Sequence, residues 1–234
     1  MRFTLDDEPF VGRVGFGVTV AVLDSGIHGD HPHVGGVQGG VALTASGDLV
    51  DRIGHGTAVA AAIREKAPGA SLLAVKVFDR QLATNVDVLA RAIVCAADEG
   101  ATIINLSLGT ANPAHAERLA DAVVHATARG ALVVSARRAN DVDWFPGSLP
   151  SVIGVMRDDT LERDEIRVTY DESVWCIHAS PFPRPIPNVP REHNLSGVSF
   201  AVANTTGFLA RAVERGGSPR AAIEALSSLI VRAS

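Results

Sequence analysis

Short apolar runs alternate along the chain with longer stretches in which apolar residues recur at helical spacing. The short runs are rich in β-branched residues and bounded by glycine or polar residues, which is typical of buried strands. Because most of these strands are apolar on both faces, the pattern predicts an α/β fold of three layers, a mostly parallel sheet covered by helices on both sides. The expected strands are residues 18–23, 71–78, 102–106, 131–136 and 151–156. The expected helices are residues 55–66, 86–99, 114–129, 200–215 and 219–232.

One domain spanning residues 1–234 is the simplest organisation for a chain of this length. No repeat or low-complexity tract divides the chain. Five prolines fall between residues 181 and 190, so this segment is expected to be an extended, ordered loop and not a helix or strand.

Composition and charge exclude several classes of protein. With 47% hydrophobic residues and 20% charged residues the chain can form a large core, and a formal charge of −5 argues against a nucleic-acid partner bound through phosphates. No apolar run approaches the ~18 residues of a membrane span. Asp6, Asp7 and Glu8 lie where a signal peptide would be basic and then apolar. We therefore expect a cytoplasmic protein with no signal peptide, no pro-domain and no membrane partner, whose Cys95 and Cys176 are reduced.

Three short segments place reactive residue types at the ends of predicted elements. Asp24 ends the first strand, His55 lies between two glycines at the start of a helix, and Ser199 opens the penultimate helix. Taken singly, each has a simpler explanation: a turn or cap for the acid, a loop position for the histidine, and an N-cap for the serine. Ligands of open parallel sheets bind beyond the carboxyl ends of the strands, however, and that is where Asp24 is expected.

Taken together, in the order Asp, His, Ser, the segments D-S-G-I, H-G-T-A-V-A-A and G-V-S-F-A resemble those of the subtilase family, the subtilisin-like serine peptidases. The resemblance runs from about residue 18 to residue 210. Four further segments match the family pattern, at residues 73–77, 104–109, 145–147 and 150–153. The resemblance implies a subtilisin-like fold and the hydrolysis of peptide bonds.

The resemblance also implies a catalytic triad. Ser199 would be the nucleophile, His55 the base that takes its proton, and Asp24 the acid that holds the imidazole in the productive tautomer. An α/β-hydrolase is excluded because its triad runs Ser, Asp, His and its elbow has a second glycine where this chain has Ala201. A dinucleotide-binding loop is excluded because the first strand is not followed by G-x-G-x-x-G.

The substrate and oxyanion sites follow from the same resemblance. An extended peptide would pair with a strand edge formed by Ser107, Leu108 and Gly109. The family supplies an asparagine as second oxyanion donor after the fourth strand; a gapless count puts Ala139 there, and a one-residue insertion restores Asn140. Alternatively, Asn140 only ends a turn. Val198 replaces the family's threonine before the nucleophile, which removes another polar group.

Two side-chain groups next to the expected substrate site are interpreted as determinants of the pocket. Trp144 would line the pocket and narrow it. Arg137 and Arg138 would either recognise an acidic substrate residue or form a pair on the surface.

No metal or other cofactor is expected. Family members often bind calcium through an acid shortly after a His-Pro pair, but here that position is His33, and residues 64–69 leave no room for the calcium loop that follows the histidine helix. His28, His31 and His33 raise the alternative of a zinc site. Their spacing is crowded and no fourth ligand is evident, so we expect solvated loop histidines.

The sequence thus predicts an intracellular serine endopeptidase that cleaves a specific peptide or precursor protein, for example during maturation of a ribosomally made peptide. The alternative is a pseudopeptidase that keeps the fold and the peptide groove but has little turnover. Two departures from the family pattern favour the alternative: valine at position 198 in place of threonine, and Asn140 one position later than the family's asparagine. The complete Asp-His-Ser set favours the enzyme.

Overall fold

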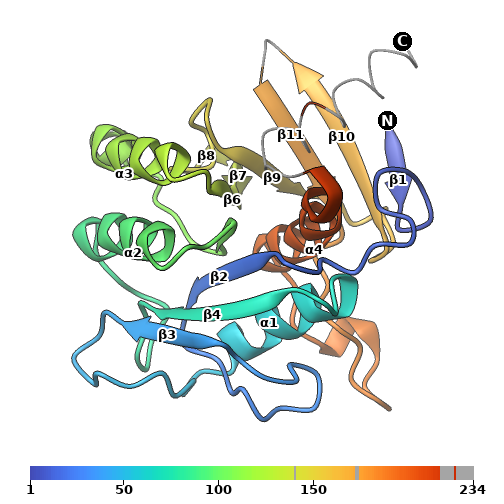
Figure 1. The fold of residues 1–234 in the computed structure, drawn as a ribbon, viewed down its shortest axis with the longest axis horizontal. Helices are drawn as coiled ribbons and strands as arrows, with labels where there is room; N and C mark the ends of the chain where they lie inside the picture. Colours follow the sequence, from blue (N-terminus) through green and yellow to red (C-terminus); the bar gives the residue numbers. More distant parts are fainter. Residues whose placement is uncertain (140, 172–173, 217–223, 225–234) are drawn as a thin grey trace.

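A computed structural model describes residues 1–139, 141–171, 174–216 and 224. At its centre lies a nine-stranded sheet in the order β1-β10-β11-β9-β6-β5-β2-β4-β3 (Figure 1). All neighbours from β11 to β3 pair in parallel, and β10 and β1 add antiparallel pairs at one edge. The strands are β1 (Arg2–Thr4), β2 (Thr19–Asp24), β3 (Gly39–Ala42), β4 (Ser71–Lys76), β5 (Ile103–Leu106), β6 (Leu132–Ala136), β9 (Ile153–Arg157), β10 (Glu165–Asp171) and β11 (Val174–Ala179). A separate two-stranded ribbon pairs β7 (Arg138–Ala139) with β8 (Val142–Asp143).

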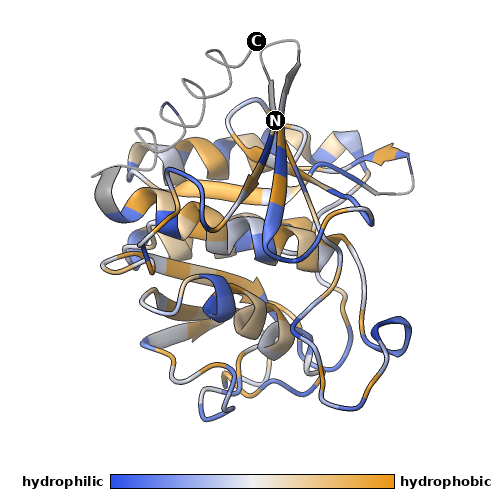
Figure 2. Ribbon diagram, turned by 90° about the vertical axis from the view of Figure 1, so that its right-hand side faces the viewer, coloured by the Kyte–Doolittle hydropathy of each residue, from blue (hydrophilic) through white to orange (hydrophobic). Residues whose placement is uncertain are grey.

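Helices cover both faces of this sheet, as the periodicity predicts. They are α1 (His55–Lys66), α2 (Val86–Asp98), α3 (Ala116–Ala128) and α4 (Val198–Gly216), with short 3₁₀ turns at Pro113–His115 and Arg191–His193. The α2 and α3 helices pack together on one face, and α1 and α4 pack together on the other (Figure 1). The core therefore has two halves, one on each side of the sheet. Figure 2 shows hydrophobic residues concentrated in the strands and on the helix faces turned to them.

The expected α/β architecture is confirmed, with differences at the ends of elements and at the edges of the sheet. The predicted helix at residues 114–129 is divided, because the Asn112 side chain caps a 3₁₀ turn before α3 begins. Four strands of the sheet were missed: β1, β3, β10 and β11. The β10 sequence E-I-R-V-T-Y-D alternates polar and β-branched or aromatic residues, a pattern typical of a strand with one face buried and the other exposed. The expected helix at residues 219–232 lies outside the described residues, apart from Glu224.

The strand order brings the predicted site together. Leu23 lies opposite Leu106 where β2 pairs with β5, so the carboxyl ends of these two strands are neighbours. Asp24 ends β2 and Ser107 directly follows β5, so both residues lie at the carboxyl ends of neighbouring parallel strands. Residues 181–190 form neither a helix nor a strand, as predicted, and lead towards α4. Among the helices described, none is both long enough and apolar enough to cross a membrane.

Candidate active site

Asp24 and His55 form a buried pair. The Nδ1 atom of His55 lies 2.8 Å from Oδ1 and 2.9 Å from Oδ2 of Asp24, whose side chain is 1% exposed. A carboxylate can only accept here, so Nδ1 carries a hydrogen, and in the neutral imidazole Nε2 has the free lone pair. The other side of the imidazole packs against Phe200, with ring centroids 5.7 Å apart. His55 is thus held in one orientation by contacts on two sides.

A second acid, which the sequence interpretation missed, lies behind this pair. Asp51 accepts hydrogen bonds from the Ser25 hydroxyl at 2.8 Å and the Thr57 hydroxyl at 2.6 Å. It also accepts from the backbone N–H groups of residues 53, 54 and 57, around the first turn of α1. Ser25 in turn donates from its N–H to Asp24 and accepts from the N–H of Gly56. Asp51 therefore joins the start of α1 to the end of β2.

The sequence contained a signal for Asp51. The acid lies four residues before His55, where a carboxylate can bind the unpaired N–H groups at the start of a helix. Burial raises the pKa of the Asp51 carboxyl, but the hydrogen bonds from Thr57, Gly54 and Ser25 outweigh burial and hold its pKa below the usual range. Asp51 is therefore ionised at neutral pH.

The pKa of His55 reflects both neighbouring acids. Burial lowers the pKa of the imidazole, while the hydrogen bond and charge of Asp24 and the charge of Asp51 raise it. The two acids outweigh burial, so the pKa of His55 lies above its ordinary value. This is the direction expected for a base that must be stabilised as an imidazolium during a reaction.

Gly56 allows the close approach of α1 to β2. A Cβ atom at Gly56 would lie 2.2 Å from the carbonyl oxygen of Gly26 and 3.1 Å from Cβ of Asp24. Gly54, just before His55, adopts φ +86°, which favours glycine. The two glycines that bracket His55 are therefore required for different reasons: Gly56 because a side chain would clash with β2 and the loop after it, and Gly54 because of its backbone conformation.

Ser199 lies in the first turn of α4 and is tied to β5. Its hydroxyl donates to the carbonyl oxygen of Ser107 at 3.1 Å, and the Ser107 hydroxyl lies 3.3 Å from the carbonyl oxygen of Ser199. Behind them, the Asn105 amide donates to the Ser107 hydroxyl at 3.1 Å and accepts from Thr206 of α4 at 2.9 Å. Asn105 and Thr206 are fully buried. A chain of polar contacts thus sets the position of Ser199 against the sheet.

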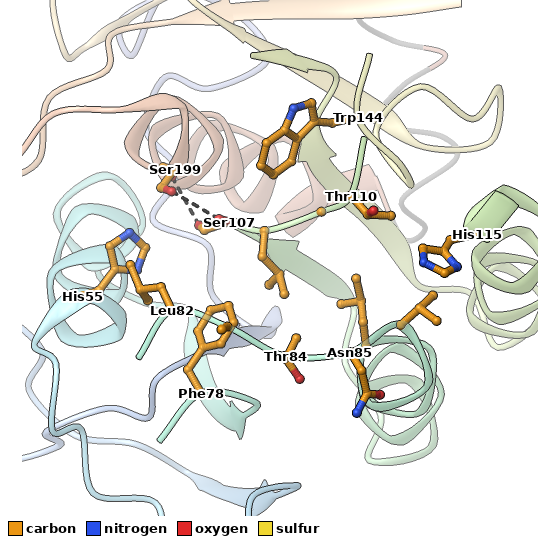
Figure 3. A pocket seen from close by; sticks show the side chains of 15 residues that line it. His55, Phe78, Leu82, Thr84, Asn85, Ser107, Thr110, His115, Trp144 and Ser199 are labelled. Carbon is orange, nitrogen blue, oxygen red and sulfur yellow. Dashed lines mark hydrogen bonds between the residues drawn. The ribbon is translucent and has the colours of Figure 1, made fainter. Parts of the chain in front are cut away.

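One cavity of about 500 Å³ joins the predicted residues (Figure 3). His55, Ser199, Ser107, Leu108 and Gly109 all line it. Part of the cavity is lined by the apolar side chains of Phe78, Leu82, Val86 and Leu89. In the described part of the chain no hydrogen bond joins the Ser199 hydroxyl to His55, because that hydroxyl is directed to Ser107. The structure therefore brings His55, Ser199 and the predicted substrate residues to one cavity, with Asp24 buried behind His55 and the serine hydroxyl bound to the carbonyl of Ser107.

The remaining predicted residues lie around this cavity or outside the description. Asn140 lies outside the described residues. Trp144 lines the cavity, as predicted. Arg138 is exposed and pairs with Asp143 in the β7–β8 ribbon, which agrees with a surface position. Arg137 also lies outside the lining of the cavity and is partly buried.

The three loop histidines pack on one another and not around a common centre. The His31 ring meets His28 and His33 edge to face, with centroids 6.3 and 5.2 Å apart, and its Nδ1 accepts the backbone N–H of His33. They line a second cavity of about 450 Å³ beside the proline-rich loop. Within the described residues, no three His, Cys, Asp or Glu side chains are grouped to hold a metal ion.

Comparison with known proteins supports the same assignment. The model of the subtilase family matches residues 15–159, which includes Asp24 and His55. The chain belongs to the subtilase family. Thermitase from Thermoactinomyces vulgaris is 31% identical over 90% of this chain and 81% of its own length. A thermophilic serine proteinase from Bacillus sp. (strain AK1) is also 31% identical, over 86% of this chain, which spans 53% of that relative.

The solved structure of the prenylagaramide maturation protease PagA is similar to this subtilase in fold. The TM-score is 0.65 at 27% identity, and the similarity covers 87% of this chain and 80% of that one. The subtilisin-like fold predicted from the three motifs is therefore confirmed.

Proposed function

We propose that this subtilase is a serine endopeptidase in which Ser199 is the nucleophile, His55 the general base and Asp24 the residue that orients His55. The observation that supports the proposal most directly is the Asp24–His55 pair, which leaves Nε2 of His55 free at a cavity also lined by Ser199. Serine hydroxyls become effective nucleophiles only beside such a base.

The chemistry would proceed in two halves. Ser199 Oγ attacks the carbonyl carbon of the scissile peptide bond, and its proton passes to Nε2 of His55. The C–N bond then breaks as His55 returns that proton to the leaving amine, which gives an ester on Ser199. Water attacks the ester carbon and loses a proton to His55. The ester C–O bond then breaks as His55 gives that proton to Ser199 Oγ, which releases the acid product and restores both residues.

Substrate binding has a defined part in this scheme. The carbonyl of Ser107 accepts the Ser199 hydroxyl in the free protein. An extended peptide that adds to the strand edge at Ser107 would bring a backbone N–H to the same carbonyl. We expect that N–H to displace the hydroxyl, which can then rotate towards His55. Catalytic hydrogen bonds often tighten only in such complexes.

The substrate class we favour is a specific precursor peptide or protein. We also keep the prediction that the enzyme acts in the cytoplasm. PagA, the 27% identical neighbour, is a maturation protease by name, which is consistent with processing of a defined peptide. The apolar side of the cavity, with Phe78 and Leu89, is suited to an extended segment of apolar residues.

The proposal is tested with a fluorophosphonate probe, which reacts only with an activated serine. The wild type should be labelled at Ser199, as located by mass spectrometry of tryptic peptides, and the Ser199→Ala variant should not. His55→Ala should label at least about a hundredfold more slowly, since base catalysis is worth that much. Equal labelling of wild type and Ser199→Ala would overturn the proposal.

A pseudopeptidase is the second candidate, favoured by one specific observation. The Ser199 hydroxyl is bonded to Ser107 and not to His55. If this bond persists with peptide bound, the protein would bind extended peptides without cleaving them. Stopped-flow assays with chromogenic peptide esters decide between the two, because an enzyme releases a burst of product equal to its concentration and a pseudopeptidase releases none.

A further inference from the structure

The backbone at Trp144 is held in place at the cavity that Ser199 also lines. Its backbone N–H donates to the carbonyl of Arg137 at 2.8 Å. The next residue, Phe145, exchanges two hydrogen bonds with Thr110, at 2.8 and 2.9 Å. The backbone on both sides of Trp144 is thus fixed to the segments that follow β5 and β6.

The indole lies directly over the strand edge that would receive a peptide. A Cβ atom at Gly109 would lie 3.1 Å from Cε3 of Trp144 and 2.6 Å from the carbonyl oxygen of Phe145. Gly109 is therefore the residue that lets the ring approach so closely. Trp144 is partly exposed and lines the same cavity as His55 and Ser199. Figure 3 shows the indole on one side of the segment with Ser107 and Thr110, and Phe78 on the other.

The alternation of side chains in a bound strand determines which residue meets Trp144. Successive side chains of an extended peptide point to opposite faces. Beside Ser199, the space on the Phe78 side is taken by the imidazole of His55 (Figure 3). The residue whose carbonyl is attacked must therefore direct its side chain to the other side, where Trp144 lies. The preceding residue then faces the apolar side of the cavity.

We infer that Trp144 restricts cleavage to peptide bonds that follow a small residue, namely glycine, alanine or serine. This inference rests on the proposed peptidase function and adds a substrate class to it. The backbone at Trp144 is bonded to both neighbouring segments and the indole lies close against Gly109, so a bulky side chain at this position could enter only if the ring left its contact with Gly109. A large aromatic or branched residue at this position would have to overlap the ring.

The first test uses two peptidyl diphenyl phosphonates that differ only in the side chain next to phosphorus, a methyl group or a benzyl group. Wild type should react at Ser199 at least about tenfold faster with the methyl probe, a ratio in the range that hydrophobic pockets achieve. Trp144→Gly should reverse or abolish that ratio, and Trp144→Phe should retain part of it. Val142→Ala is the matched control, since this exposed residue of β8 is outside the cavity and should leave the ratio unchanged.

The second test separates this inference from the proposed function. Two fluorescein-labelled peptides, ending in alanine or in phenylalanine, are titrated against the Ser199→Ala variant and followed by anisotropy. The alanine peptide should bind at least about tenfold more tightly, and adding Trp144→Gly should remove the difference. If fluorophosphonate labelling fails but this preference appears, the peptidase proposal fails and the selectivity stands. Equal binding of the two peptides, binding of neither peptide, or a ratio unaffected by Trp144→Gly would overturn the inference.

Discussion

The Nδ1 atom of His55 lies within 2.9 Å of both carboxylate oxygens of Asp24, at 2.8 Å from the nearer one. The same Oδ1 atom also accepts the backbone N–H of Ser25 at 2.8 Å, so the carboxylate cannot rotate freely. One buried acid thus determines both the orientation of the imidazole and the nitrogen that carries its hydrogen. In the mechanism we propose, His55 is a base only because Asp24 is an acceptor.

Replacing that acceptor by a donor should abolish most of the activity. In Asp24→Asn the amide can donate to Nδ1 and favour the wrong tautomer of His55, so kcat should fall by about four orders of magnitude while peptide affinity changes little. The measurement is steady-state cleavage of a chromogenic peptide ester with alanine before the scissile bond, and anisotropy with the labelled peptide that ends in alanine gives the affinity. A loss smaller than tenfold, in a variant that melts at the wild-type temperature, would contradict the assigned role of Asp24.

The pH dependence of activity should reflect the effect of Asp24 and Asp51 on the pKa of His55. Because the pKa of His55 is raised and only neutral imidazole can act as base, kcat/KM should fall as the pH drops through a value above the ordinary 6.5 of histidine. Asp51→Asn removes one of the charges that raise this pKa, so the acidic limb should move to lower pH. Profiles that coincide for wild type and Asp51→Asn would show that Asp51 has no electrostatic effect on His55. A loss of rate at all pH values alone would indicate a purely structural role.

The close approach at Gly56 should be sensitive to a single methyl group. Since a Cβ there would lie 2.2 Å from the Gly26 carbonyl oxygen, Gly56→Ala must displace the start of α1 from Asp24. We expect a loss of about 1–3 kcal/mol in unfolding free energy and at least about a hundredfold in kcat. Urea unfolding and peptide cleavage measure the two effects. Gly39→Ala is the control, because a Cβ at Gly39 meets no atom within 4 Å.

Two adjacent threonines of α4 allow a matched test of the buried polar chain. The Thr206 hydroxyl donates to Asn105, whereas the buried hydroxyl of Thr205 has no partner in the described part of the chain. Thr206→Val should therefore cost about 1–3 kcal/mol of unfolding free energy, because Asn105 loses a hydrogen bond in the core. Thr205→Val should be neutral or stabilising, because it removes a polar atom that is buried without compensation. Equal effects of the two substitutions on urea unfolding would argue against the Asn105 network.

The sequence by itself determined the parallel sheet, the helices on both faces and the positions of Asp24, His55 and Ser199. These features depend on short-range patterns: apolar runs, helical periodicity, and reactive residues next to glycines or helix starts. The strands β10 and β11 were not predicted, although β10 pairs with β1 and β11 and β11 pairs with β10 and β9. Their place in the sheet depends on pairing with segments distant in the sequence, which a local pattern does not specify.

Only the tertiary structure decided the contacts between segments distant in the sequence. The bond from Ser199 to the Ser107 carbonyl spans 92 positions, and that from Thr206 to Asn105 spans 101. The Asp51–Ser25 link and the indole of Trp144 over Gly109 likewise arise where separate loops meet. No local propensity specifies such contacts, because their geometry depends on the strand order and on how closely glycines let the backbones approach. That geometry, and not the motifs alone, determines where the serine hydroxyl points and how much room remains beside it.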